Sequence, residues 1–587
     1  SILIVGGTPC SGSWWILKKT VCYMHKPTNE SALSPYRVLD LTDEKGHFCG
    51  KILADLGADV IKIEPPGGDP VRFRGPFYGD TADVDKSLNW WAFNTSKRGI
   101  TLDLESVEGQ ETLRKLVSIS DILIESYPPG YMDKIGLGYK TLSLLNPGLI
   151  YVSISPFGQT GPYSDWKGPD LITMALGGLM YHAGDSDRPP IRISTPQANL
   201  DACLHAAAGA MMALWHRLHT GQGQYVDASI QASIPQFLIA ELPFWEYGKK
   251  LLHRSGPRRA ISKHMVRQIY PCKDGHVSIL IIGGPLGKLF RPLAVWMQEE
   301  GMGNNLMAVP WENLDLAKYS QQDVDSWEEA IKTFFMKHTH AELLTGAFER
   351  KIPLTPGYTI PDLLQYEQLK HRQFWVEVEH PELSTRITYP GPPFKLNLTP
   401  WQIRERAPLL GQHNKEVMEE LSHHQAVRTS GIMNSTTQNP QIKHLPLQGI
   451  VVADFTRVLI GPLLGKYLAD FGATVIRIES RLALDQHRVT VPYKGEPNLN
   501  RSGIFPLLNS SKLSLGLNLS HPKGIDIAKQ LIARCDVVLE NFVPGMMERW
   551  GLAFEDLKKI KPGIVMFRHS MQGQSGPYAR HPGFGWN

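Results

Sequence analysis

The sequence predicts a duplicated α/β fold: a Rossmann-like open parallel sheet that occurs twice, with a small α+β domain in the first copy. The first observation is a repeat. Leu53–Glu64 (LADLGADVIKIE) returns as Leu468–Glu479 (LADFGATVIRIE), with nine of twelve positions identical. Self-similarity at one long offset indicates a tandem duplication. Two further pairs keep the offset of 415 residues, namely Asn94–Lys97 with Asn509–Lys512 and Gly158–Tyr163 with Gly573–Tyr578.

The second observation is an order of strand, helix and parallel strand near the start of each copy. Tyr36–Leu41 is a short apolar run typical of a buried strand, Gly50–Leu56 has helical spacing, and Val60–Glu64 alternates and is β-branched. Further strands are expected at residues 100–104, 121–125 and 149–154, with a helix at 109–119. The sheet should therefore be open and doubly wound. A GxGxxG motif is missing from the first turn, which disfavours NAD.

The remaining elements set the expected domain boundaries. Residues 199–219 are rich in Ala, Leu and Met and predict a closely packed helix, after which Gly221–Ser229 enters another strand. Beyond residue 235 the alternation weakens, and a strand is expected at 277–282. We expect an N-terminal extension outside the fold (residues 1–35), a first large domain in two segments (36–235 and 386–421) and a small domain (236–385). A linker (422–446) should lead to a second large domain (447–587) that is cut short at Asn587.

Composition excludes several function classes. Sixty-one basic and 57 acidic residues give a net charge of only +4, which makes nucleic acid an unexpected partner. Six cysteines without CxxC spacing fit free thiols in a reducing compartment, so the protein is expected to be cytoplasmic. No apolar run is long enough to cross a bilayer, and no membrane association is expected. The pairs His338/His340 and His423/His424 lack convergent Cys or carboxylate spacing, which predicts no metal.

Taken together, these stretches resemble the CaiB/BaiF family, the class III CoA-transferases. The resemblance extends from about Tyr36 over nearly the whole chain. It implies an enzyme that moves coenzyme A between an acyl-CoA and a free carboxylic acid. Its tandem form implies an intramolecular pseudo-dimer, with further homo-oligomerisation left open. The motifs that carry it, besides the repeated twelve residues, are NTSKRGITLDL (94–104), GQTGPYSD (158–165), GQGQYVDASIQ (221–231) and RAPLLGQHN (406–414).

The resemblance also implies a nucleophilic aspartate that forms an anhydride and then a thioester with CoA. Asn199 occupies that position, and an amide cannot perform this chemistry. Asp201 would point some 200° away around a helix. Asp170 resembles the acid/base aspartate of the family's racemase branch, but no histidine lies between Asp121 and Phe157 to pair with it. A helix-capping role before Leu171 is the alternative for Asp170.

The residues that the resemblance assigns to CoA binding differ between the copies. The second copy carries Glu540-Asn-Phe-Val-Pro-Gly545 followed by Arg549, whereas the first carries Glu125-Ser-Tyr-Pro-Pro-Gly130 followed by Lys134. A lysine does not replace the planar fork of an arginine at a phosphate. The resemblance thus implies CoA binding by the second copy, through Asn541, Phe542, Arg549, Val458 and Lys512.

The two asymmetries together predict a catalytically degenerate first half. The offset of 415 places the second copy's counterpart of Asn199 at about residue 614, where we expect aspartate. An acyl-CoA racemase and a non-catalytic CoA-binding or scaffolding subunit remain the alternative functions.

Overall fold

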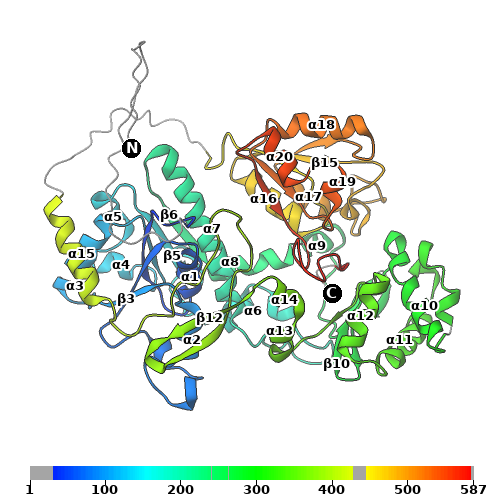
Figure 1. Cartoon of the computed structure of the whole chain (residues 1–587), viewed down its shortest axis with the longest axis horizontal. Coiled ribbons are helices and arrows are strands. Elements are labelled where there is room, and N and C mark those ends of the chain that lie inside the picture. The colour runs from blue at the N-terminus through cyan, green and yellow to red at the C-terminus, as the bar shows by residue number, and fades with distance from the viewer. Residues whose placement is uncertain (1–30, 240, 262, 304, 428–444, 584–587) are drawn as a thin grey trace, which may run out of the picture.

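The computed structural model describes residues 31–583 except 240, 262, 304 and 428–444. Most of the expected extension at 1–35, and residues 428–444 of the expected linker, lie outside the described residues. Two parallel sheets and a separate helical and β-stranded domain make up the fold, with the second sheet and the small domain on the same side of the first (Figure 1). The predicted duplicated α/β fold class is confirmed.

The first sheet has six parallel strands in the order β3-β2-β1-β4-β5-β6. This is the strand order of doubly wound nucleotide-binding folds. Val38 pairs with both Val60 and Ile122, so β1 lies at the centre. The strands are β1 (Arg37–Leu41), β2 (Asp59–Glu64), β3 (Arg98–Thr101), β4 (Ile122–Glu125), β5 (Ile150–Ser155) and β6 (Tyr225–Ser229).

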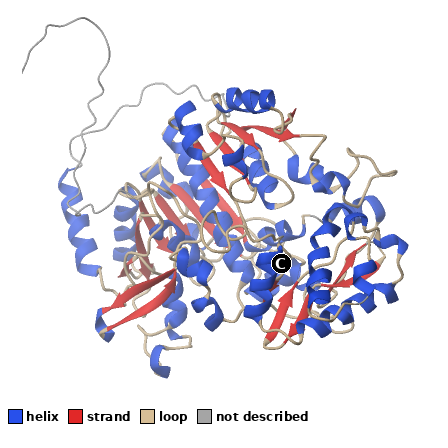
Figure 2. Ribbon diagram, turned by 45° about the vertical axis from the view of Figure 1, so that its right-hand side comes forward, coloured by secondary structure: helices blue, strands red, loops and turns tan. Residues whose placement is uncertain are grey.

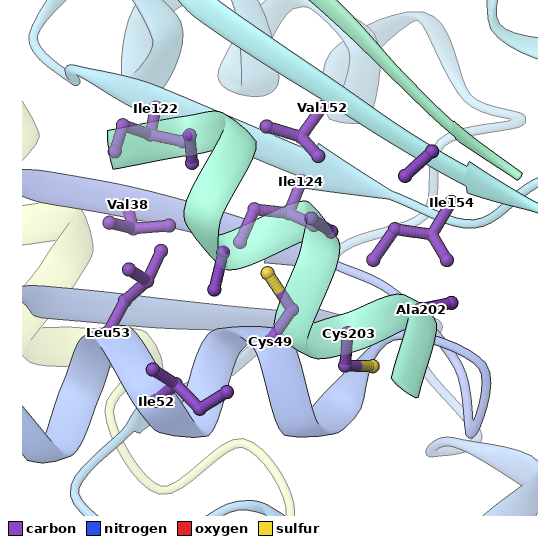
Figure 3. Packing of buried hydrophobic residues seen from close by; sticks show 14 of the residues in the cluster. Val38, Cys49, Ile52, Leu53, Ile122, Ile124, Val152, Ile154, Ala202 and Cys203 are labelled. Atoms are coloured by element: carbon purple, nitrogen blue, oxygen red, sulfur yellow. The ribbon is translucent and has the colours of Figure 1, made fainter. Parts of the chain in front are cut away.

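Helices cover both faces of this sheet because its strands are apolar on both sides. Figure 3 shows α1 and α7 packed on one face, where Cys49 and Cys203 meet strand residues such as Ile124. Helices α3, α5 and α15 bury Leu113, Leu142 and Val417 on the other face. The helices of this unit are α1 (His47–Asp55), α2 (Leu88–Phe93), α3 (Val107–Ser118), α4 (Tyr131–Lys134), α5 (Tyr139–Leu145), α6 (Asp170–Leu176), α7 (Gln197–Thr220), α8 (Ile230–Ser233), α9 (Leu242–Gly248) and α15 (Asn414–Val427).

The second sheet repeats five of the six strands, in the order β16-β15-β14-β17-β18, all parallel. The core on one face contains α18, α19 and α20. On the other face α16 lies beside Met212 and Trp215 of α7, so that α7 contacts both units. The elements are β14 (Val451–Asp454), α16 (Ile460–Asp470), β15 (Thr474–Glu479), α17 (Ile504–Asn509), β16 (Leu513–Gly516), α18 (Pro522–Ile532), β17 (Val537–Glu540), α19 (Met546–Arg549), α20 (Phe554–Ile560) and β18 (Val565–Arg568).

The small domain has its own core, formed by residues 266–354 and including Trp296, Trp311 and Phe335. Figure 2 shows its short strands surrounded by helices. Its elements, with the hairpin that follows, are β7 (Arg258–Ile261), β8 (His264–Arg267), β9 (Ile269–Cys272), β10 (Gly275–Ser278), α10 (Arg291–Glu299), α11 (Gln321–Phe335), α12 (His340–Arg350), β11 (Thr355–Pro356), α13 (Ile360–Gln365), α14 (Glu367–His371), β12 (Trp375–His380) and β13 (Thr385–Pro390).

Several boundaries differ from those expected. The strand expected at 277–282 ends at Ser278. Leu33 packs into the first core, so the fold begins before residue 36. Helix α15 runs to Val427, into the expected linker. The β12–β13 hairpin spans the expected boundary at 385/386 and packs on Trp90 and Trp91 of the large domain, because cross-strand pairing keeps its two strands together. No helix of the described residues is long and apolar enough to cross a membrane.

Candidate functional site

The order of the second sheet reverses between β14 and β17. From β14 the chain moves outward to β15 and β16 and then returns to β17 on the other side. In open α/β sheets, ligands bind in the crevice outside the carboxyl ends of the strands at such a switch point. The loops that follow these two strands, residues 455–459 and 541–545, border this crevice. They contain most of the residues that the resemblance assigns to CoA.

Asn541 joins the two loops. Its Oδ1 accepts a hydrogen bond from the backbone N–H of Arg457 at 2.8 Å, and its Nδ2 donates to the Arg457 carbonyl oxygen at 2.8 Å. The guanidinium of Arg457 lies 5.6 Å from the centre of the Phe542 ring. Asn541 therefore fixes the walls of the crevice relative to each other, and both of its side-chain groups are engaged with protein.

Val458 has a strained backbone. Its φ of 69° is uncommon for any non-glycine residue and rarer for a β-branched one. The backbone N–H of Val458 donates to Asp485 Oδ2 at 3.2 Å, which helps to hold the loop in this conformation. Strain of this kind is concentrated at binding sites, where the surrounding structure enforces it. The predicted CoA contact at Val458 thus falls on a preorganised loop.

Arg549 is an exposed cation of this region, as is Arg580. It ends the short helix α19, and its side chain contacts only Met546 Sδ, at 3.3 Å, with no carboxylate partner among the residues that the structure describes. A neighbouring cavity of about 360 Å³ is lined by Gly545, Glu548, Arg568 and Arg580, and by Phe348 from the small domain. Arg568 is neutralised by Glu540 and Glu548. Arg549 is therefore available to bind an anion such as a phosphate.

Lys512 is placed differently from the prediction of a direct contact. Its ammonium group is buried and donates to Asp454 Oδ2, to the Pro462 carbonyl oxygen and to Asn509 Oδ1 at 2.7–3.1 Å. All three of its protons are thus committed to the protein. Burial lowers the pKa of Lys512, although the ion pair with Asp454 opposes this. Its role is to position the start of α16 beside the crevice.

The first unit keeps this buried lysine but not the loop it supports. Lys97 donates to Asp40 Oδ2, to the His47 carbonyl oxygen and to Asn94 Oδ1 at 2.8–2.9 Å. The loop after β1, however, is one residue shorter: Thr42 corresponds to Thr456, 414 residues on, whereas Gly46 corresponds to Gly461, 415 residues on. Helix α1 accordingly begins later than α16. This change of offset was the signal in the sequence that could have revealed the deletion.

In the first unit, the side chains at the positions of Arg457 and Asn541 bind to each other. Ser126 Oγ donates to Asp43 Oδ1 at 2.8 Å and accepts from the Asp43 backbone N–H at 2.8 Å, while Lys45 pairs with the same carboxylate. These contacts lower the pKa of Asp43 against the opposing effect of burial. Lys134 ends α4 and is exposed. The first crevice thus lacks the arginine and the strained valine.

Asp170 and Asn199 lie side by side in the first unit. The backbone N–H of Asn199, in the first turn of α7, donates to Asp170 Oδ1 at 3.0 Å. Asp170 is the first residue of α6, after the N-cap Pro169, so its capping contact goes to α7 and not to α6 as expected. Desolvation raises the pKa of Asp170, while hydrogen bonds from α7 oppose the rise. The Oδ1 atom of Asn199 is buried without a partner among the described residues.

Asp201 faces a different part of the molecule. Its carboxylate lies 3.7 Å from His205 Nε2, and the His205 ring packs edge-on against Tyr467 of α16. Burial raises the pKa of Asp201. This carboxylate therefore borders the second unit.

The small domain covers one loop of the second unit, a contact that sequence reasoning did not locate. Gln368 Nε2 donates to the carbonyl oxygens of Gln572 and Ser575 at 2.5 and 2.8 Å, and its Oε1 accepts from the Tyr578 N–H at 2.9 Å. Tyr366 stacks on Tyr578. No local sequence pattern predicts this contact, because its partners are about 200 residues apart. It places the small domain beside the 360 Å³ cavity.

Fold and site together define a tandem α/β protein whose second unit has a switch point between β14 and β17, bordered by the loops that follow these strands. The family model of "CoA-transferase family III" matches residues 33–414 and 447–587. The chain belongs to this family, in two copies.

Known relatives agree with this assignment. The chain is 36% identical over 397 residues to succinyl-CoA:(R)-benzylsuccinate CoA-transferase subunit BbsE of Thauera aromatica, covering 66% of this chain and 94% of that protein. It is 34% identical over 392 residues to succinyl-CoA–D-citramalate CoA-transferase of Chloroflexus aurantiacus, covering 66% and 94%. A crystal structure of a CaiB/BaiF family protein from Brucella suis has a TM-score of 0.56 at 28% identity, covering 67% and 99%. These likenesses support CoA transfer as the general activity.

Proposed function

We propose that this chain is a CoA-transferase module in which the second unit binds the nucleotide end of an acyl-CoA and the first unit is catalytically degenerate. The observation that carries the proposal is the difference between the two crevices. In the second unit Asn541 holds the strained Val458 loop, and Arg549, without a carboxylate partner among the described residues, follows the Asn541 loop in the chain. In the first unit a shorter loop and a Ser126–Asp43 contact stand in their place.

The expected chemistry divides between substrate binding and nucleophilic attack. In the second unit, Arg549 would hold a phosphate of CoA, while the Val458 loop would present backbone to the ligand. In the first unit, an amide at position 199 cannot attack an acyl-CoA carbonyl, and so no aspartyl anhydride or thioester forms there. Lys512 acts only by holding the start of α16.

Asn199 also favours a second candidate function, a CoA-binding or scaffolding subunit without turnover. The acyl-CoA racemase alternative gains no support from the structure around Asp170, whose carboxylate is engaged with the start of α7. The two retained functions differ only in whether the full site carries a nucleophile.

Calorimetric titration of CoA and mass spectrometry after incubation with acyl-CoA test the proposal. We expect one CoA per chain and no acyl or CoA adduct on Asn199, Asp170 or Asp201. Binding that survives Arg549→Ala but is lost in Lys134→Ala would reverse the assignment of units. A covalent adduct on Asp170 or Asp201 would overturn the degenerate first unit.

A further inference from the structure

Three potential metal ligands meet in the small domain, far from the crevices. Cys272 ends β9, Asp274 lies in the turn to β10, and His340 is the first residue of α12. One donor atom from each lies within 4.8 Å of the others. The expectation that no cysteine or carboxylate converges on His340 is therefore wrong. It failed because 66 residues separate Asp274 from His340, and spacing rules detect only local ligand pairs.

The distances between the three ligand atoms are close to those around a tetrahedrally coordinated cation. Cys272 Sγ lies 3.5 Å from Asp274 Oδ1. A zinc ion with bonds of about 2.3 Å to sulfur and 2.0 Å to oxygen, at the tetrahedral angle, separates those ligands by about 3.5 Å. His340 Nδ1 lies 3.9 Å from Asp274 Oδ1, so these two atoms must approach by roughly 0.6 Å. A small side-chain rotation achieves this, since Asp274 is half exposed.

The second nitrogen of His340 contacts the backbone of His276. His340 Nε2 lies 2.9 Å from the His276 carbonyl oxygen and 3.1 Å from the His276 backbone nitrogen, so it donates to the carbonyl in one tautomer and accepts from the N–H in the other. A ligating histidine usually donates its other ring N–H to a carbonyl or carboxylate, which fixes the tautomer and turns the free nitrogen toward the metal. With the proton on Nε2, Nδ1 faces Cys272 and Asp274. Gly275 permits this placement, because a Cβ there would lie 2.6 Å from the imidazole Cε1.

The carboxylate of Asp274 can still bind a cation. Asp274 Oδ1 already accepts from the His340 backbone N–H at 2.8 Å, but a carboxylate oxygen has a further lone pair for a metal.

We propose that Cys272, Asp274 and His340 form a zinc-binding site that joins the β9–β10 hairpin to the start of α12. Binding replaces the thiol proton, which leaves to solvent, by Zn²⁺. Three protein ligands leave one position for water, and the exposed side of Asp274 provides the path of entry. The imidazole of His340 packs edge-on to Tyr358, which contacts the Tyr366 ring that stacks on the second unit, so the metal would rigidify the docking face of the small domain.

Metal binding to the full chain tests this proposal. After removal of metals with a chelator, wild-type protein should take up one equivalent of Co²⁺ with a thiolate-to-cobalt charge-transfer absorption, and Zn²⁺ should displace it. Cys272→Ser should abolish that absorption, and His340→Gln should weaken binding at least as much as the 10- to 100-fold typical of lost supporting contacts. Matched controls are Cys535→Ser, a buried thiol in the second unit, and His338→Gln, two residues from the site.

An independent measurement on wild-type protein covers the case in which the variants fail to fold. Zinc X-ray absorption should show one sulfur at about 2.3 Å together with nitrogen or oxygen at about 2.0–2.1 Å. Sub-stoichiometric uptake, a coordination shell without sulfur, or loss of the cobalt band in Cys535→Ser would overturn the proposal. CoA binding is measured in a separate titration, and its result does not depend on whether the protein binds zinc.

Discussion

In both units a buried lysine ties the end of the first strand to the start of the helix after it, through the same three types of acceptor. The loop between that strand and helix nevertheless differs: the second unit has the strained Val458, and the loop of the first unit is one residue shorter. The framework is thus the same in both copies, whereas the loop that we propose to face the ligand differs. This pattern teaches that fold and site diverge separately after duplication, since a framework must be kept for stability while a spare site need not be.

The largest effect should come from removing the shared lysines. Lys97→Met leaves Asp40 buried without its nearest cation, and breaking a buried pair costs about 3–5 kcal/mol. Lys512→Met should do the same to Asp454. Hydrogen exchange of β1–β2 and of β14–β15 reports each unit separately. Lys332→Met, which removes an exposed pair, is the control and should change little. Loss of protection in one unit only would show that the frameworks are not equivalent.

The next effect is a pH dependence of the first unit's stability. Burial raises the pKa of Glu125 to about 7, because Ser153 stands where the second unit has Arg568 beside Glu540. A carboxyl with a raised folded pKa stabilises the fold fully below the unfolded pKa near 4.5, and this contribution is lost as pH rises through 7. The loss is about 3 kcal/mol.

Urea unfolding, followed by circular dichroism at pH 5 and pH 8, measures this difference. Glu125→Gln should flatten the pH dependence of the unfolding free energy. Glu540→Gln should instead destabilise the second unit, because it leaves Arg568 with only the exposed Glu548. An equal pH dependence in wild type and Glu125→Gln would contradict the assignment to Glu125.

A smaller effect concerns ligand binding and sharpens the comparison directly. Arg549→Ala should weaken CoA binding by about 1.5–3 kcal/mol, the contribution of a hydrogen bond to a charged group. Lys134→Ala, its counterpart in the first unit, should leave the affinity almost unchanged. Calorimetric titration of CoA into each variant gives both values, and a greater loss at Lys134 would exchange the roles of the two units.

The smallest effect is expected at the contact between the small domain and the second unit. Gln368→Ala removes three hydrogen bonds to the 572–578 loop and should lower its local opening free energy by about 1 kcal/mol. Gln365→Ala, on the neighbouring helix, is the matched control. Amide exchange of Tyr578 is the readout. The first unit's equivalent, Tyr163, is 45% exposed and should exchange quickly in all variants.

The sequence by itself determined the duplication and the alternation of strands and helices, and it showed that the motif residues differ between the two copies. Repeats, hydrophobic periodicity and identifiable motifs are local signals, so β2 and β15 were expected at nearly their observed positions. The amide at Asn199 and the Asn541–Arg549 motif could be read for the same reason. Whether the second unit supplies a nucleophile stays a prediction.

Only the tertiary structure decided which side chains face the crevice and which hold it in place. Lys512 matched a motif, but its ammonium group donates all its protons to buried acceptors. Asp170 accepts a hydrogen bond from the first turn of a helix 29 residues along the chain. Residue types and spacings encode local conformation. The partner that satisfies each polar atom or covers each apolar face comes from distant parts of the chain, and no spacing rule specifies it.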